Sequence, residues 1–302
     1  MNLEQTPASP ASFAPDPLLL SLLRCVNCGH PQLSLSINRL VCTACNVFYD
    51  MRSPGIPRLM TNKAVQRNAI HEQRWDAMRR ADYDQICREN GPVWEAIDTF
   101  AMKYCSGLAL EVCCGHGRFL DVLRRTPGVE RISGLDISLS MLRTAWDKGH
   151  RCLIQASADD LPIRNATVDT VASSGSGLSF LPREKAYAEI ARILKPAGIF
   201  VFDLLNFWPS VIDCAWWQYI SKGRVPGVEI LRQYKLAGNM RSARREVTLL
   251  RRAGLEVVEM KSVRYAPLLR RRKLGYWPGF WGSKIGYDTV FVCQRLKSER
   301  EN

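Results

Sequence analysis

The chain has 302 residues, of which 46% are hydrophobic, and a formal net charge of +13 at neutral pH. This length and composition suffice for one large packed domain and a small one. No apolar run approaches the roughly 20 residues that cross a membrane. The early apolar run Leu18–Leu23 has no basic segment before it, so it supports neither a secretory signal nor an anchor. We therefore expect a cytoplasmic protein without a transmembrane segment.

The positive charge is concentrated in the last fifth of the chain. Residues 241–302 contain 15 Lys or Arg and 6 Asp or Glu. A basic surface attracts phosphates, RNA or anionic membranes. An ordinary solvated surface explains the same pattern equally well, so the charge constrains partners but does not determine the chemistry.

The amino-terminal region divides into a tail and a small cysteine-containing unit. Residues 1–17 are rich in Pro, Ala and Ser and lack periodicity, which predicts a disordered tail. Residues 18–60 carry two Cys-x-x-Cys pairs, Cys25 with Cys28 and Cys42 with Cys45. This spacing is typical of a zinc ribbon, in which four thiolates fill a tetrahedral Zn²⁺ site and leave no position open for catalysis. The remaining seven cysteines are scattered, which favours reduced thiols over a disulfide scaffold.

Residues 61–107 show helical patterning with many charges, and we expect a helical lid or linker there. Its aromatic residues Trp75, Tyr83 and Trp94 are candidates for an acceptor pocket. Aromatic residues at helical spacing are more often part of a core.

From Leu108 onward, apolar strand-like runs alternate with helical patterns, which predicts a doubly wound α/β fold with a parallel sheet covered on both faces. The predicted strands are Leu108–Val112, Arg131–Leu135, Arg151–Gln155, Val168–Ala172, Gly198–Asp203, Leu255–Val263 and Asp288–Gln294. The link from Arg264 to Tyr287 should leave from the carboxyl ends of the parallel strands, the ligand side of an open sheet.

The stretch from Leu108 to Phe119 predicts a strand, a tight turn and a helix. Gly115 and Gly117 lack a Cβ atom, so the backbone of this turn can approach a ligand closely. Asp136 ends the next apolar run about twenty residues later, where nucleoside-binding folds place a carboxylate for the ribose hydroxyls.

Five motifs in order strengthen this interpretation. They are Glu111-x-x-x-Gly115-x-Gly117, Gly134-Leu-Asp136-Ile-Ser-x-x-Met141, Asp159-Asp-Leu-Pro162, Val168-Asp-Thr-Val-Ala172 and Ile193-Leu-Lys-Pro-Ala-Gly198. Together they resemble class I S-adenosylmethionine-dependent methyltransferases over about residues 68–302. The resemblance implies a Rossmann-like seven-stranded methyltransferase sheet over residues 108–302. The cysteine unit resembles zinc ribbons that precede methyltransferase domains, including bacterial ribosomal-RNA guanine methyltransferases.

The resemblance also implies the residues that bind S-adenosylmethionine. Glu111 would hold the methionine end, Asp136 the ribose, and Ile137 with Met141 the adenine. Ser157 stands where the family usually has Asp, although Asp159 lies near enough in sequence to compensate. The full expected set is Glu111, Cys113, Gly115, Gly117, Asp136, Ile137, Met141, Ser157, Ala158 and Ser173.

The sequence does not identify a catalytic residue. The sulfonium donor is already activated, so placement can supply most of the acceleration. Candidate general bases are His116, His71, Tyr83 and Asp203, although His116 lies within the glycine turn and is more readily explained as a cofactor contact.

The run Ser173-Ser-Gly-Ser-Gly after the fourth strand lacks the Asn-Pro-Pro-Tyr of amino-methyltransferases of adenine and cytosine. No Pro-Cys pair occurs, which argues against covalent cytosine-C5 chemistry.

The acceptor remains open between a small or biosynthetic molecule in an aromatic pocket and structured RNA. Asn206-Phe-Trp-Pro, Cys214-Ala-Trp-Trp-Gln-Tyr and Tyr276-Trp-Pro-Gly-Phe-Trp281 could roof such a pocket. Contact with an anionic substrate or a membrane surface could use Arg270, Arg271, Arg272 and Lys273. The small molecule is favoured because the ribbon is nearly charge-balanced. An inactive nucleotide-binding module is a further alternative.

Overall fold

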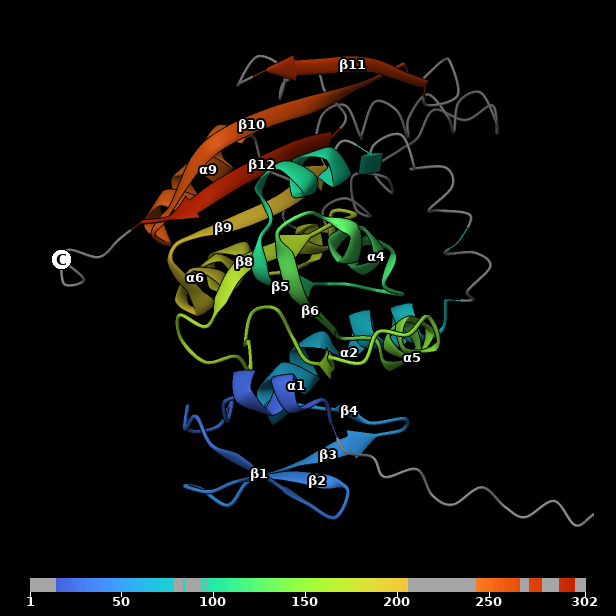
Figure 1. The fold of residues 1–302 in the computed structure, drawn as a ribbon, viewed down its shortest axis with the longest axis vertical. Helices are drawn as coiled ribbons and strands as arrows, with labels where there is room; N and C mark the ends of the chain where they lie inside the picture. The colour runs from blue at the N-terminus through green and yellow to red at the C-terminus, as the bar shows by residue number, and fades with distance from the viewer. Residues whose placement is uncertain are drawn as a thin grey trace, which may run out of the picture.

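The computed structural model describes residues 15–78, 84, 94–95, 97–205, 243–266, 272–278 and 288–296. These residues form a small antiparallel sheet near the amino terminus and a large mixed sheet flanked by helices (Figure 1). Within these ranges, no helix is long and apolar enough to cross a membrane. Helix α1 (Pro17–Leu22) begins at the last residue of the expected tail, and residues 1–14 lie outside the described residues.

The small sheet contains the two cysteine pairs. Its strands β1 (Leu33–Ser36), β2 (Arg39–Cys42), β3 (Phe48–Arg52) and β4 (Ile56–Pro57) pair antiparallel in that order. The turn between β1 and β2 places Asn38 at φ 54°, a backbone conformation that asparagine tolerates better than most residues. We call residues 18–60 the ribbon. Its buried leucines and Tyr49 join the same apolar core as the large sheet, so the ribbon packs onto the rest of the protein.

The large sheet has the strand order β11-β10-β12-β9-β8-β5-β6-β7. Strands β5 to β9 are parallel, β12 is antiparallel to β9 and β10, and β11 is antiparallel to β10. Their bounds are β5 (Gly107–Val112), β6 (Val129–Asp136), β7 (Leu153–Gln155), β8 (Val168–Ser173), β9 (Leu194–Leu205), β10 (Leu255–Ala266), β11 (Arg272–Pro278) and β12 (Asp288–Arg295). The predicted α/β class and all seven predicted strands are confirmed.

One strand was not predicted. Residues 272–278 fall in the link that the sequence suggested was irregular, yet they form β11. The pairing runs from Lys261 opposite Pro278 to Ala266 opposite Arg272. Strand β10 extends past Val263, where its other neighbour β12 ends. The extended backbone of β10 therefore has donors and acceptors for a further strand at this edge.

Helices cover both faces of the large sheet. Consecutive strand residues point to opposite faces, so the apolar strands have side chains to bury on each side. Leu110, Phe200 and Phe202 pack in one apolar core, while Ala109 and Val201 pack in the other. The first core also contains residues of α6 (Arg183–Ile193) and α9 (Ala243–Arg252), and the second contains residues of α4 (Arg118–Arg125) and α5 (Leu139–Asp147). Residues 97–104 are helical, and Ile97, Phe100 and Ala101 belong to the second core. These layers leave the carboxyl ends of the parallel strands for the site.

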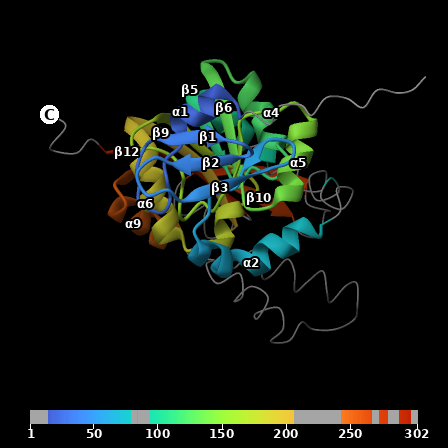
Figure 2. The same cartoon turned by 90° about the horizontal axis from the view of Figure 1, so that it is seen from below.

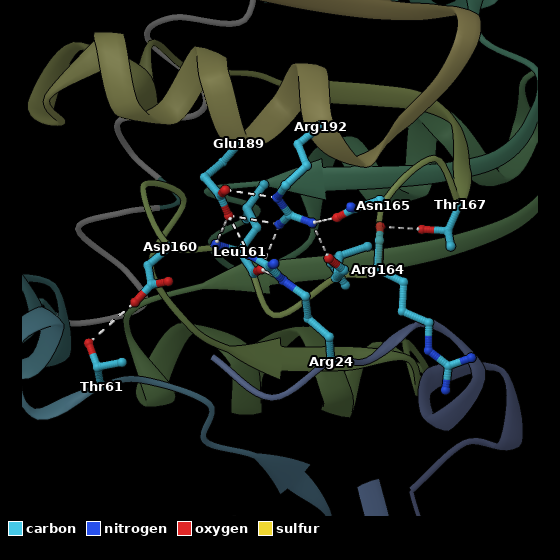
Figure 3. A network of polar contacts seen from close by, with 10 residues as sticks. Arg24, Thr61, Asp160, Leu161, Arg164, Asn165, Thr167, Glu189 and Arg192 are labelled. Atoms are coloured by element: carbon cyan, nitrogen blue, oxygen red, sulfur yellow. Dashed lines mark hydrogen bonds and ion pairs between the residues drawn. The ribbon is translucent and has the colours of Figure 1, made fainter. Parts of the chain in front are cut away.

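A polar network centred on Arg192 joins the ribbon to the segment before β8 (Figure 3). The Arg192 guanidinium donates to both Glu189 carboxylate oxygens at 2.8 Å and to the Ile163 carbonyl at 2.7 Å. Glu189 also accepts from the Leu161 backbone N–H at 2.8 Å and from Arg24 at 3.4 Å. Burial disfavours the ionised form of Glu189, but the donors from Arg192 outweigh it and lower the pKa of this carboxyl. The network therefore contributes stability only while Glu189 is ionised.

We expect Glu189→Ala to lower the free energy of unfolding by about 2 kcal/mol, because Arg192, Arg24 and the Leu161 N–H lose one acceptor together. Urea unfolding at neutral pH measures the loss. Lys185→Ala, at an exposed position of the same helix, is the control. The loss should shrink as the pH falls through the lowered pKa of Glu189. Equal free energies of unfolding for Glu189→Ala and Lys185→Ala would contradict the stabilising role of Glu189.

Candidate cofactor cleft and metal centre

The turn after β5 is held by a carboxylate from the next strand. Gly115 lies at φ 52°, and its N–H donates to Oδ2 of Asp136 at 2.8 Å. The other oxygen of Asp136 accepts from the Ser138 N–H at 2.9 Å. Burial raises the pKa of Asp136, although these backbone donors oppose the rise. Asp136 therefore fixes the position of the turn and keeps its carboxylate at the carboxyl ends of β5 and β6.

A cleft with about 740 Å³ of empty space, part of it open to solvent, lies beside this turn. We call it the strand-end cleft. It is lined by Asn68, His71, Trp75, Cys113, Gly115, Leu135, Asp136, Ile137, Met141, Ala156, Ser157, Ala158, Ser174, Gly175, Gly177, Phe180 and Leu181.

Seven of the ten expected cofactor residues line the strand-end cleft, namely Cys113, Gly115, Asp136, Ile137, Met141, Ser157 and Ala158. Glu111, Gly117 and Ser173 do not. A Cβ atom on Gly117 would lie 2.9 Å from His150 and 3.1 Å from Ala145. Gly117 therefore permits close packing at the start of α4.

Glu111 and Ser173 lie buried behind the cleft. Burial raises the pKa of Glu111 well above its ordinary value, and the nearby charge of Arg118 opposes the rise. Arg118 donates to Asp98 at 3.0 Å and to the cleft residue Ser174 at 2.7 Å. Glu111 Oε2 and the Ser173 hydroxyl are both buried without a hydrogen-bond partner. Glu111 Oε2 and the Ser173 hydroxyl can therefore form hydrogen bonds with a ligand whose polar end extends past the residues that line the cleft.

Helix α2 (Asn62–Asp76) supplies one wall of the cleft. Trp75 was a pocket candidate and His71 a candidate base, and both line the cleft. Their rings lie 6.2 Å and 6.4 Å from that of Phe180 in the 3₁₀ turn η1 (Gly177–Phe180). Asn68 was missed, because a polar residue within a charged helical pattern looks like a solvated one. It is 3% exposed, and this burial carries no signal in a single sequence.

Ser157 belongs to a buried hydrogen-bonded chain. The amide of Asn68 donates to the Ser157 hydroxyl at 3.0 Å, and that hydroxyl donates to Asp159 Oδ1 at 2.5 Å. Arg67 pairs with the same Asp159 oxygen at 2.8 Å. Asp159 thus orients the serine that replaces the family's usual aspartate, and it does so from a position that does not line the cleft.

Comparison with known proteins matches the central segment to a family model. Residues 110–202 match the model described as "Methyltransferase domain". Residues 110–202 are thus similar to known methyltransferase domains. The fold is similar to that of an S-adenosylmethionine-dependent methyltransferase from Thermotoga maritima, with a TM-score of 0.52, 19% identity, and coverage of 72% of this chain and 95% of that chain.

Two curated proteins are each similar in sequence to about a third of this chain. A ubiquinone/menaquinone biosynthesis C-methyltransferase of Campylobacter jejuni is 30% identical over 97 residues, which cover 30% of this chain and 41% of that protein. An uncharacterized protein of Methanocaldococcus jannaschii is 33% identical over 99 residues, which cover 33% of this chain and 37% of that protein. The chain thus spans about two fifths of the length of these relatives.

The candidate bases differ in their access to the strand-end cleft. His71 lines it. His116 is 3% exposed, and its Nε2 lies 3.4 Å from Asp84 Oδ1; it does not line the cleft. Tyr83 lies outside the described residues. Asp203 lies next to the lining segment rather than in it.

Asp203 forms a buried carboxyl pair with Asp288. The Ser176 hydroxyl donates to Asp203 Oδ2 at 2.8 Å and lies 3.5 Å from Asp288 Oδ2. Asp203 and Asp288 are 1% and 2% exposed. Burial raises the pKa of each carboxyl, and the charge of Asp203 raises the pKa of Asp288 further. The charge of Arg118 opposes the rise at Asp203. The pair therefore retains a proton more readily than two exposed aspartates.

The four cysteines of the ribbon fit a tetrahedral metal ion. Their Sγ atoms all lie within 4.8 Å of one another, and the Cys25–Cys45 and Cys28–Cys42 pairs are each separated by 3.6 Å. Zinc–sulfur bonds of about 2.3 Å in a tetrahedron place the sulfurs about 3.8 Å apart. All nine described cysteines are free thiols, so this cluster is not a pair of disulfides.

Tyr49 supports the cysteine cluster from the small sheet. Its hydroxyl accepts from the Asn27 N–H at 3.3 Å and lies 3.1 Å from Cys25 Sγ, where it can donate to a thiolate. Tyr49 is 5% exposed. Such a donor stabilises a metal-bound thiolate and fixes its orientation.

Most of the expected acceptor segments fall outside the described residues. These are Asn206–Pro209, Cys214–Tyr219, Arg270, Arg271 and residues 279–281. Arg272 and Lys273 lie on β11, as do Tyr276 and Trp277.

We expect Tyr49→Phe to weaken zinc affinity about tenfold, because Cys25 loses its hydrogen-bond donor. Competition with a calibrated chelator measures this affinity. Gln32→Ala, at an exposed position of the ribbon, should leave it unchanged. Equal zinc affinity of the tyrosine variant and the native chain would contradict the role of Tyr49.

The carboxyl pair predicts a pH dependence of stability. Because the folded pair binds a proton more tightly than the unfolded chain, its stabilising contribution is present at low pH and is lost as the pH rises above the ordinary aspartate pKa. Asp288→Asn should therefore raise Tm at pH 7 to 8 and flatten its decline with pH. Asp147→Asn, at an exposed position, is the control. A Tm decrease for Asp288→Asn that is the same at every pH would contradict a shared proton.

Proposed function

We propose that this protein is an S-adenosylmethionine-dependent methyltransferase that binds its donor in the strand-end cleft. The observation that supports this most is the convergence of Gly115, Asp136, Ile137 and Met141 on one cleft at the carboxyl ends of β5 and β6. That edge is where open α/β sheets bind nucleotides. The donor brings an electrophilic methyl sulfonium, so the chain has to bind, orient and exclude water.

The residues of the cleft suit the parts of the donor. Each Asp136 oxygen accepts one backbone N–H and retains a lone pair for a ribose hydroxyl. Ile137 and Met141 offer apolar contact to adenine. The Ser157 hydroxyl, oriented by Asp159, lies at the adenine end. Unpartnered Glu111 Oε2 and the turn at Cys113 and Gly115 suit the methionine end.

We propose a small or biosynthetic molecule as the acceptor, with ribosomal RNA as the alternative. The ribbon offers few free cations to RNA, because its arginines lie near carboxylates. Arg24 lies 3.4 Å from Glu189 and Arg58 lies 3.2 Å from Glu72. Arg39 and Arg52 lie 3.5 Å and 3.8 Å from Asp50. An RNA-binding ribbon would keep such side chains for phosphates.

The ribbon is proposed to hold Zn²⁺ through Cys25, Cys28, Cys42 and Cys45, in a structural role. Four thiolates complete the coordination shell. We also propose a cytoplasmic location, because free thiols are typical of a reducing compartment.

Calorimetric titration with S-adenosylhomocysteine tests the donor site. We expect binding, and we expect Asp136→Asn to weaken it about tenfold, because one ribose acceptor is replaced by an amide. Affinity for S-adenosylhomocysteine should also fall as the pH is lowered, and the fall should begin above the ordinary aspartate pKa. The reason is that the pKa of Asp136 is raised and protonation of this carboxylate removes an acceptor. The exposed variant Asp147→Asn is the control. No binding at millimolar ligand would contradict the proposal and favour an inactive module.

The acceptor class is tested separately by RNA binding against salt concentration. If the acceptor is a small molecule, the affinity for RNA should fall with salt no more steeply than for a general basic surface. Tight, salt-sensitive binding to ribosomal RNA that is lost with Ala at Arg270, Arg271 and Arg272 would favour the RNA alternative.

A further inference from the structure

The segment that leaves the ribbon is shared between the two sheets. The N–H of Arg58 donates to the Asp50 carbonyl on β3 at 2.9 Å, and the N–H of Leu59 donates to the Gln155 carbonyl on β7 at 3.0 Å. Arg58 and Gln155 form a parallel bridge. Two consecutive residues thus connect the last long strand of the ribbon with the edge of the large sheet.

Helix α2 starts directly after this connection and is held at its first turn. The Thr61 hydroxyl accepts from the Ala64 N–H at 3.2 Å and donates to Asp160 Oδ2 at 3.2 Å. Further along α2, the Glu72 carboxylate accepts from Arg58 at 3.2 Å and from the Gln155 side chain at 2.9 Å. Glu72 therefore ties the helix to both the ribbon and β7.

The side of α2 next to Glu72 forms a wall of the strand-end cleft. Asn68, His71 and Trp75 line it, and Asn68 orients Ser157. At the carboxyl end of α2, Asp76 accepts from the Ser138 hydroxyl at 2.6 Å and the Ser140 N–H at 3.1 Å. These residues immediately follow Asp136 and Ile137. The position of α2 therefore decides the shape of the adenine side of the cleft.

We expect the ribbon to depend on a bound metal more than the large sheet does. Most residues of β1 and several of β3 are exposed, and Cys25 and Cys42 are part of the ribbon's limited core. A small unit of this kind gains much of its order from metal ligation. Without the metal, β3 would offer a less ordered partner to Arg58, and α2 would have a less defined start.

We propose that metal binding at the four cysteines and donor binding in the strand-end cleft are positively coupled through α2. The inference rests on the proposed function, because it requires that the cleft binds the donor. The ordered ribbon positions α2, and a bound adenosine, packed against α2, favours the same arrangement. Each ligand then increases the affinity for the other by the same factor.

Chelator competition with and without saturating S-adenosylhomocysteine measures this coupling from the metal side. We expect the nucleoside to tighten zinc binding about fivefold or more. Calorimetry on the zinc-loaded and zinc-depleted chains should give the same factor for S-adenosylhomocysteine, with circular dichroism to compare their folded content. Zinc affinity that is unchanged by bound S-adenosylhomocysteine would overturn the coupling and leave the donor site intact. Absence of nucleoside binding to the zinc-loaded chain would overturn the proposed function as well.

The variant Glu72→Ala separates coupling from a general stabilising role of the ribbon. Glu72 does not line the cleft or touch the cysteines, so zinc affinity without nucleoside should stay as in the native chain. In Glu72→Ala, we expect S-adenosylhomocysteine to leave the affinity for zinc almost unchanged. Gln66→Ala, at an exposed position of α2, should keep the full factor. Full coupling in Glu72→Ala would show that α2 does not carry it.

Discussion

The backbone hydrogen bonds at the edge strand β7 are the constraint on which the arrangement depends. An uncovered edge strand exposes donors and acceptors to solvent and to other chains. Here the residues after β4 cover it, through Leu59 and the Gln155 carbonyl. The chain then continues into α2 (Figure 2). Because residues of α2 line the cleft, covering the edge also sets one wall of it. The same connection therefore determines the positions of the ribbon, the sheet edge and one wall of the strand-end cleft.

The other wall of the cleft follows from parallel strands that end together. Gly115 after β5 and Asp136 at the end of β6 are 21 residues apart in sequence, and one hydrogen bond joins them. Buried acids gather behind this edge, with the pKa of Glu111, Asp203 and Asp288 raised by burial. A cleft with such a polar back and an aromatic front suits a ligand that is apolar at one end and charged at the other.

The sequence predicted the parts of the fold that depend on local pattern. Apolar runs marked all seven strands, and the spacing of the cysteines marked a cluster whose geometry suits zinc. It did not predict β11, because pairing with β10 depends on an available edge rather than on the residues 272–278 themselves. Asn68 was missed for a similar reason, since its partner Ser157 lies 89 residues away. The prediction that Gly117 binds the cofactor stands beside a second role, because the missing Cβ also permits close packing against Ala145 of α5. The acceptor pocket could not be derived because its candidate segments follow no periodic pattern.

The central claim is that the ribbon-bound helix α2 and the strand ends together form the donor site. Amide hydrogen exchange of the zinc-loaded chain, with and without S-adenosylhomocysteine, tests it most directly. The account predicts increased protection in three strand-end segments, Cys113–Gly117, Asp136–Met141 and Ala156–Ala158, together with Thr61–Asp76. Protection of the strand-end segments with no change in Thr61–Asp76 would contradict the role of α2. Protection confined to other parts of the chain would contradict the donor site itself.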